Sequence, residues 1–194
     1  EFCTSGFNVL TFDWRGFGES QHFPVDTNYM VYNEFLTDYH AAVDFAKQIE
    51  TVDETKIGVF GFSTGAFLSY SIAQQREDIK AIAARGIFVD YKSLKSRLVE
   101  INPEDTYLIP ENIDEYSPKS TWNSFSKPIF LIVGENDIRT PVKDAKEIIL
   151  NVKSKKKDLW IVEGAGHGGI YGPEVVQTEL FFKKTVDFFN ENLN

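Results

Sequence analysis

The feature that most constrains this sequence is a regular alternation between short apolar runs and longer segments with helical periodicity. The short runs are rich in β-branched or aromatic residues, and they predict strands over 7–12, 57–60, the end of 81–89, 129–133 and 159–162. The intervening segments carry apolar residues at helical spacing and predict helices over 31–49, 65–75, 145–152 and 174–190. Strands that alternate with helices form a parallel sheet with helices on both faces. We therefore predict an α/β fold with an open, mostly parallel sheet flanked by helices.

One segment interrupts this alternation. Residues 91–127 contain three prolines, and the stretch 99–117 carries acidic residues with no Lys or Arg. A chain of 194 residues is the size of one domain. We therefore predict a single domain over 1–194, with 91–127 as a small cap inserted over the edge of the sheet. Tyr107, Tyr116 and Trp122 in this cap are candidate apolar walls of a substrate pocket.

Composition excludes several classes of protein. The formal net charge of −9 argues against a binder of nucleic acid or of anionic membranes, because phosphate contact needs a basic surface. No apolar run approaches the roughly 18 residues of a membrane span. The single cysteine, Cys3, excludes an intramolecular disulfide and a metal site built from several cysteines, and it favours a cytoplasmic location.

A serine stands between two glycines directly after the strand predicted at 57–60. That strand is followed by the sequence GFSTG over 61–65, which opens the next helix. A sharp strand-to-helix turn lifts a serine hydroxyl clear of the sheet, and flanking glycines remove side chains that would collide there. The pattern predicts Ser63 as a nucleophile, with the backbone N–H of Thr64 placed to stabilise an oxyanion. A glycine-rich turn without function would produce the same pattern.

Such a serine needs a base, and the chain contains three histidines. His167 lies in the glycine-rich loop GAGHGG after the last predicted strand, where open α/β sheets place functional groups. His40 falls within a predicted helix and is expected to be structural or exposed. His22 follows a turn and is a candidate to border the site. We predict His167 as the base.

The third member of such a site is a carboxylate that orients the imidazole and stabilises its charged form. Asp137 follows the strand predicted at 129–133 and is our candidate. Asp90 is its rival, because it ends the run GIFVD and points toward the same edge of the sheet. Glu135 lies nearer the strand, and we expect it to be solvated or to brace the loop.

Four segments together resemble the α/β-hydrolase superfamily over essentially the whole chain. They are DWRGFGES over 13–20, GFSTG over 61–65, GENDIRTP over 134–141 and GAGH over 164–167. The resemblance implies Ser63 as nucleophile, Asp137 as acid and His167 as base, in the family's chain order and with no metal or organic cofactor. It also implies that Asp13 and Arg15 are structural residues.

The sequence departs from this family at its beginning. The family places a strand and an oxyanion loop upstream of the segment at 13–20, and residues 1–6 look like the end of the helix that follows that loop. The missing strand would lie between those predicted at 7–12 and 57–60. A gap there would leave unpaired backbone groups in the core, which is costly. We therefore expect residues 1–194 to be the C-terminal portion of a larger chain, whose upstream loop supplies a second oxyanion donor.

The resemblance implies a serine hydrolase similar to esterases and lipases. We predict that it cleaves a small-molecule carboxylic ester or thioester through an acyl-enzyme on Ser63, since alcohols and thiols leave more easily than amines. The same three residues would also serve a serine peptidase or an acyltransferase. A non-catalytic binding module on the same fold is a further alternative, which the missing oxyanion loop favours and the intact set of three residues opposes.

Overall fold

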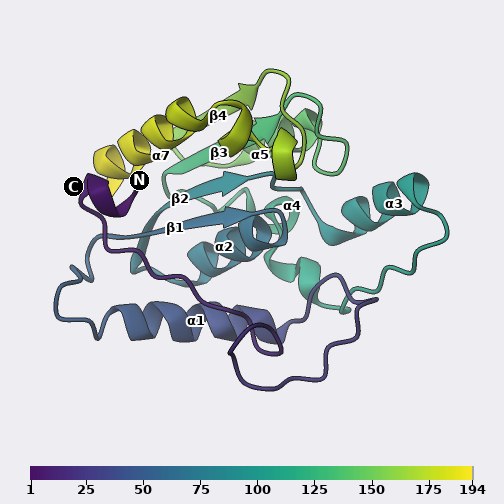
Figure 1. Cartoon of the computed structure of the whole chain (residues 1–194), viewed down its shortest axis with the longest axis horizontal. Coiled ribbons are helices and arrows are strands. Elements are labelled where there is room, and N and C mark those ends of the chain that lie inside the picture. The colour runs from purple at the N-terminus through teal and green to yellow at the C-terminus, as the bar shows by residue number, and fades with distance from the viewer. Residues whose placement is uncertain (194) are drawn as a thin grey trace.

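The computed structural model describes residues 1–193 and centres on a four-stranded parallel sheet (Figure 1). The strands lie side by side in chain order, as Ile57–Phe62 (β1), Ile79–Arg85 (β2), Ile129–Gly134 (β3) and Lys157–Val162 (β4). Every residue of β3 is buried, which explains its continuous apolar sequence. The predicted α/β fold with a parallel sheet is confirmed.

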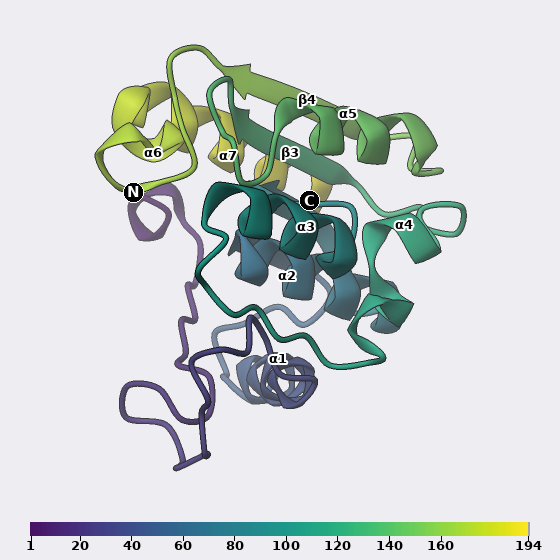
Figure 2. The ribbon, with the colours of Figure 1, turned by 90° about the vertical axis from the view of Figure 1, so that its right-hand side faces the viewer.

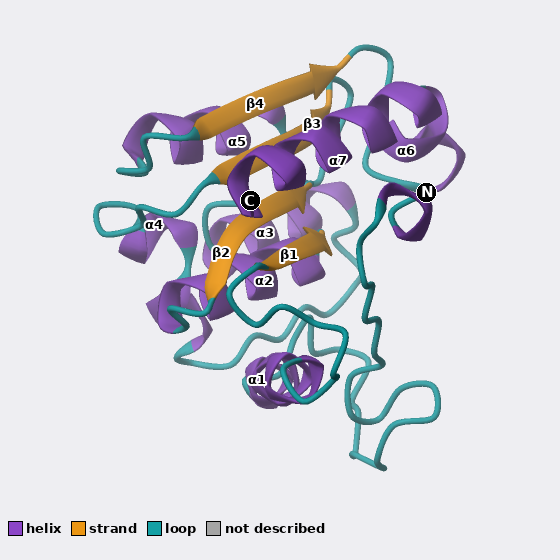
Figure 3. Cartoon of the chain, turned by 90° about the vertical axis from the view of Figure 1, so that its left-hand side faces the viewer, coloured by secondary structure: helices purple, strands orange, loops and turns teal. Residues whose placement is uncertain are grey.

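Helices cover both faces of this sheet. Figure 3 shows α7 on one face, with α2 and α5 on the other, and Figure 2 shows α1 packed outside α2. The helical segments are Cys3–Ser5 (η1), Glu34–Ala46 (α1), Thr64–Gln75 (α2), Tyr91–Ile101 (α3), Ile113–Tyr116 (η2), Pro118–Thr121 (α4), Val142–Asn151 (α5), Gly169–Tyr171 (η3), Pro173–Val176 (α6) and Thr178–Leu193 (α7).

The alternation of side chains along β2 divides the core between the two faces. Ile82 and Ala84 pack into the cluster that contains residues of α2 and α5, whereas Ala81 and Ala83 pack against aromatic residues of α7. Successive side chains of a strand point to opposite faces, so a strand buried on both sides needs apolar residues at every position. All four of these residues are fully buried.

The strand predicted at 7–12 is wrong. No backbone ladder joins this segment to β1 among residues 1–193, and Val9, Leu10 and Phe12 are 50%, 41% and 39% exposed. Phe12 instead packs edge-on against Tyr39 of α1, with ring centroids 5.0 Å apart. A β-branched, apolar run forms a strand only when a neighbouring strand pairs with it, and β1 is an edge strand of the described sheet.

Most other boundaries shift by a few residues, and two elements differ more. The strand predicted at the end of 81–89 lies earlier, as β2 over Ile79–Arg85. It ends there because Gly86 turns the chain with a φ of 62°. The helix predicted over 174–190 is two helices, α6 and α7, separated at Gln177, which has a φ of −133° and a ψ of 52°.

Residues 91–127 form the connection between β2 and β3. It consists of α3, a loop, η2 and α4, and the loop contacts the segment before α1 at a backbone bridge between Leu108 and Tyr29. Tyr91 anchors the start of α3 in a cluster with Phe67 and Phe88. Within residues 1–193, no helix is long and apolar enough to cross a membrane.

Candidate active site

Ser63 lies at the sharp turn between β1 and α2. Its φ of 53° is the only positive φ of a non-glycine residue in the described chain. Gly61 allows the turn to close, because a Cβ at that position would lie 2.2 Å from the carbonyl oxygen of Gly65. The Ser63 N–H donates to the Arg85 carbonyl at 2.9 Å, which ties the turn to the end of β2. With a ψ of −119°, this backbone conformation is sparsely populated and costs a non-glycine residue about 1–3 kcal/mol, so the fold holds this hydroxyl at an energetic cost.

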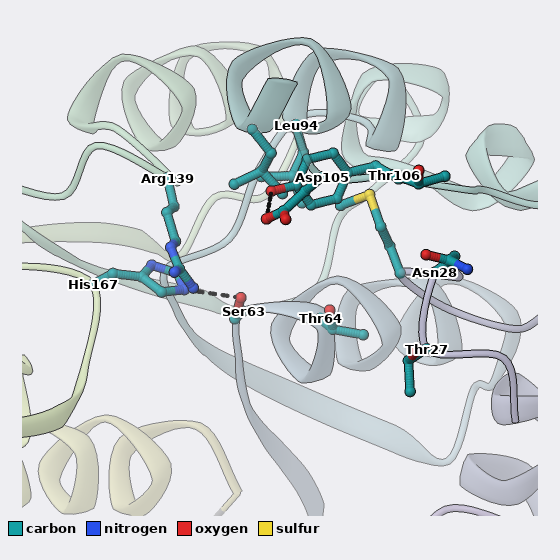
Figure 4. A pocket seen from close by; sticks show the side chains of 12 residues that line it. Thr27, Asn28, Ser63, Thr64, Leu94, Asp105, Thr106, Arg139 and His167 are labelled. Atoms are coloured by element: carbon teal, nitrogen blue, oxygen red, sulfur yellow. Dashed lines mark hydrogen bonds between the residues drawn. The ribbon is translucent and has the colours of Figure 1, made fainter. Parts of the chain in front are cut away.

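The structure brings Ser63, His167 and Asp137 together in one hydrogen-bonded chain. His167 Nε2 lies 3.0 Å from Ser63 Oγ, the contact drawn as a dashed line in Figure 4. His167 Nδ1 lies 2.8 Å from Asp137 Oδ2. The three residues follow the carboxyl ends of β1, β4 and β3, so the parallel sheet delivers all three to one edge.

Asp137 is held as an anion. Its side chain is 1% exposed, and its carboxylate accepts hydrogen bonds from the backbone N–H groups of Arg139 and Thr140 and from the Thr140 hydroxyl. Burial alone would raise the pKa of Asp137, but the hydrogen bonds from His167 and Thr140 outweigh it and hold that pKa below its ordinary value. An ionised carboxylate only accepts, which places a proton on His167 Nδ1 and leaves Nε2 as an acceptor for the Ser63 hydroxyl.

Ser63 and His167 open into a pocket of about 440 Å³. Figure 4 shows Ser63, His167 and Arg139 at one end of this pocket, with Thr27 and Asn28 at the other. Residues from 91–127 also line it, including Leu94 and Leu98 of α3 and the loop residues Asp105, Thr106 and Tyr107.

One of the three predicted pocket walls lines this pocket and two do not. Tyr107 lines it, as predicted. Trp122 packs instead against the core cluster beneath α2 and α5, and Tyr116 belongs to η2, where its carbonyl accepts from Ser71. The sequence analysis also missed eight lining residues, namely Thr27, Asn28, Met30, Leu94, Leu98, Asp105, Thr106 and Arg139. Arg139 carried a usable signal, since it stands two residues after Asp137 in the same loop.

The rival candidates have other partners. Asp90 accepts from the Ser93 N–H at the start of α3 and pairs with Lys119 at 2.9 Å, so it caps a helix. His40 contacts Gln75 at 3.2 Å, and His22 is exposed. Glu135 accepts from the Gly164 N–H at 3.1 Å and thus braces the loop before His167, as expected.

The site combines a hydroxyl, an imidazole and a carboxylate that are hydrogen-bonded in sequence. Thr64 is the first residue of α2, and the first N–H groups of a helix have no acceptor within that helix. Its N–H is therefore available to a negative oxygen next to Ser63. In residues 1–193, no group of three or more His, Cys, Asp and Glu side chains is arranged to hold a metal ion.

Sequence comparison finds relatives in several bacteria. The chain is 27% identical over 180 residues to the uncharacterized protein YfhR of Escherichia coli O157:H7, covering 88% of this chain and 59% of that protein. It is 24% identical over 189 residues to the uncharacterized protein Rv2307c of Mycobacterium tuberculosis, covering 96% of this chain and 61% of that protein. The chain thus spans about three fifths of the length of these relatives.

Solved structures share the fold. The esterase Pf2001 of Pyrococcus furiosus superposes with a TM-score of 0.78 at 24% identity, covering 98% of this chain and 73% of the esterase. The acylaminoacyl peptidase of Pyrococcus horikoshii superposes with a TM-score of 0.67 at 20% identity, covering 82% of this chain and 28% of the peptidase. These likenesses confirm the α/β-hydrolase fold.

The structural likenesses show the fold, whereas a family profile shows the family, because it matches residues 2–194. That match includes both ends of the sheet and all of the loops that bear Ser63, Asp137 and His167. The chain belongs to the prolyl oligopeptidase family, within the α/β-hydrolase superfamily.

Proposed function

We propose that this chain is a serine hydrolase that cleaves a carboxylic ester or thioester through an acyl-enzyme on Ser63. The observation that carries the proposal is the continuous hydrogen-bonded chain from Asp137 through His167 to Ser63, with contacts of 2.8 Å and 3.0 Å. Both distances lie within the range for proton transfer between a nucleophile and its base. The esterase Pf2001 among the structural neighbours agrees with this proposal.

In the first step, His167 Nε2 removes the proton from Ser63 Oγ as that oxygen attacks the carbonyl carbon. The carbonyl oxygen becomes negative, and the Thr64 N–H at the start of α2 donates to it. His167 then gives its proton to the leaving alcohol or thiol. A water molecule then attacks the carbonyl carbon of the acyl-enzyme, with His167 again as base. This step releases the acid and restores the Ser63 hydroxyl. Asp137 stays ionised throughout and stabilises the imidazolium.

An alkylphosphonate probe tests the nucleophile. We expect wild type to gain the mass of one phosphonyl group on Ser63, because the hydroxyl attacks phosphorus as it would attack a carbonyl. Ser63→Ala should not react, whereas Ser96→Ala should react like wild type, since Ser96 is an exposed serine of α3 that does not line the pocket. Equal labelling of wild type and Ser63→Ala would refute the assignment. An unreactive wild type would favour a non-catalytic binding module.

A serine peptidase is the second candidate. Membership of the prolyl oligopeptidase family and the likeness to an acylaminoacyl peptidase favour it. The two candidates differ in leaving group, so a panel of p-nitrophenyl esters against matched aminoacyl amides separates them. We expect turnover of the esters at a rate well above that of the amides. Faster amide cleavage would assign the chain as a peptidase, and transfer of the acyl group to an added alcohol would assign an acyltransferase.

A further inference from the structure

Arg85 is a buried arginine beside the proposed active site. It is the last residue of β2, and only 5% of its surface is exposed. Its neighbours along β2 are apolar, and Arg85 does not line the pocket that contains Ser63. A buried guanidinium is retained only where other groups satisfy it.

Three groups surround the Arg85 guanidinium. Its Nη1 donates to the carbonyl oxygen of His167 at 2.7 Å, and its Nη2 pairs with Glu174 Oε1 of α6 at 3.1 Å. Its central carbon lies 3.4 Å from the centre of the Phe62 ring, so the planar group stacks on that ring. Burial lowers the pKa of Arg85, and the carboxylates of Glu174 and Asp137 oppose that effect. Arg85 therefore links the residue before Ser63, the backbone of His167 and α6.

The loop that carries His167 needs such a link. The sequence GAGHGG over 164–169 contains four glycines, which leave its backbone with unusual freedom. The Asp137 contact fixes the His167 ring, but it does not fix the backbone of the residue. The Phe62 ring packs against the imidazole as well, with centroids 5.0 Å apart. A side chain placed on Gly168 would lie 3.0 Å from Phe62, so this loop fits closely over the Phe62 ring and the guanidinium that stacks on it.

We propose that Arg85 is a positioning residue that holds the His167 backbone so that Nε2 stays within reach of Ser63 Oγ, with Glu174 and Phe62 fixing the guanidinium. The inference rests on the proposed function of Ser63 and His167, and it adds a role for a residue that touches neither reacting atom. A misplacement of about 1 Å in such a site can cost roughly 100-fold in rate.

Arg85→Met tests this role, because methionine fills much of the space but cannot donate to His167. We expect phosphonylation of Ser63 to slow by roughly 10- to 100-fold and kcat to fall with KM unchanged, since Arg85 lies outside the pocket. Arg76→Met is the matched control. Arg76 pairs with Asp44 and Asp78, each at 2.6 Å, but it precedes β2 at the opposite end of the sheet. Its loss should lower stability and leave the labelling rate unchanged.

A proton NMR measurement reads the geometry without any turnover. The proton shared by His167 Nδ1 and Asp137 Oδ2 should give a far-downfield resonance, and we expect it to shift or broaden in Arg85→Met and to persist in Arg76→Met. If Arg85→Met does not fold, Arg85→Lys replaces it in the labelling and NMR measurements. Lysine keeps the charge, but its single ammonium group cannot stack and bridge as the guanidinium does, so labelling should slow several-fold.

Two results would separate the failure of this inference from the failure of the proposed function. A folded Arg85→Met or Arg85→Lys variant with the wild-type labelling rate and an unchanged downfield resonance would overturn the role of Arg85. A wild-type protein that the probe does not label would overturn the serine hydrolase, while the comparison of resonances would still decide whether Arg85 positions His167.

Discussion

Gly86 provides both a left-handed backbone and empty space beside His167. Its φ is 62°, and a Cβ there would lie 3.1 Å from Thr140 Oγ1 and 3.3 Å from His167 Cε1. Both neighbours belong to the network around Asp137. We expect Gly86→Ala to lower the free energy of unfolding by about 1–2 kcal/mol and to slow phosphonylation of Ser63, because the new methyl group displaces the imidazole. Urea denaturation and the labelling rate measure the two effects.

Gly6→Ala separates backbone strain from crowding. Gly6 has a φ of 90°, and a Cβ there would meet nothing within 4 Å. The variant should therefore show a similar loss of stability and the wild-type labelling rate. If Gly86→Ala also labels at the wild-type rate, a methyl group beside His167 does not affect the reaction of Ser63 with the phosphonate.

Residue patterns predicted Ser63 and His167, because each follows a strand and parallel strands end at the same edge. They left Asp90 as a rival to Asp137, and the family resemblance together with the observed contact to His167 distinguishes the two. Tyr116 and Trp122 were misplaced, since they lie in the irregular segment 91–127, where no period fixes the direction of a side chain. Arg85 was overlooked although its position at the end of the apolar run AIAAR is a readable signal. Its partners are 82 and 89 residues away in the chain, and only the fold brings them together.

At the scale of elements, one ion pair joins α3 to α5 and to the loop that carries Asp137. Arg97 of α3 donates to Asp144 of α5 at 2.6 Å and to the Arg139 carbonyl at 3.0 Å. Asp144 is buried, and burial raises its pKa although Arg97 opposes the shift. The ion pair therefore holds α3, which contributes Leu94 and Leu98 to the pocket, near the edge of the sheet that carries Asp137.

Arg97→Met should lower the free energy of unfolding near pH 7 by about 1–3 kcal/mol, because it leaves the buried Asp144 carboxylate without its cation. The pKa of Asp144 in the folded state is already above its ordinary value, so the folded state takes up a proton more readily than the unfolded state. Stability linked to this group therefore rises as pH falls, and the deficit of the variant should shrink by about pH 5. Urea denaturation at both pH values measures it.

The double variant Arg97→Met with Asp144→Asn is the control for this pH dependence. The double variant has no titrating carboxylate at position 144, so its loss of stability relative to wild type should not shrink as pH falls. An equal deficit of Arg97→Met at both pH values would show that Asp144 does not carry the effect.

The apolar runs predicted the strands at 57–60 and 129–133 but failed at 7–12. The runs at 57–60 and 129–133 became β1 and β3, since each has a neighbour in the described sheet. The run at 7–12 (FNVLTF) is also rich in apolar residues but has no partner strand within residues 1–193. Local sequence reports the preference of a segment for extended backbone, whereas pairing depends on which other segment lies beside it.

Across the whole molecule, the two ends of the sheet carry different groups of charges. The carboxyl ends hold Ser63, His167 and Asp137. Near the amino end of β2, Asp78 pairs at 2.6 Å with Arg76, which follows α2, and at 3.0 Å with Lys47, which follows α1. These contacts join the ends of α1 and α2 to the sheet. These ionic contacts are remote from the pocket and belong to the scaffold alone.

Asp78→Asn tests this separation through its pH dependence. The hydrogen bond from Arg76 and the one from Lys47 lower the pKa of Asp78, although burial opposes them. A carboxylate with a lowered pKa contributes stability above the ordinary value of 3.8, and that contribution is lost as pH falls through its folded-state pKa. We expect the variant to lose on the order of 1 kcal/mol at neutral pH. Urea denaturation from neutral pH down to about pH 3 should show this deficit beginning to narrow below the ordinary value of 3.8, as the Asp78 carboxylate of the unfolded chain becomes protonated.

The same variant should react with the alkylphosphonate at the wild-type rate, because the contacts it removes lie at the end of the sheet opposite Ser63. A deficit that stays constant down to acid pH would show that the ionised form of Asp78 contributes nothing. A slower reaction with Ser63 at full folding would show that the scaffold charges act on the site through the sheet, so that the geometry of His167 depends on both of its ends.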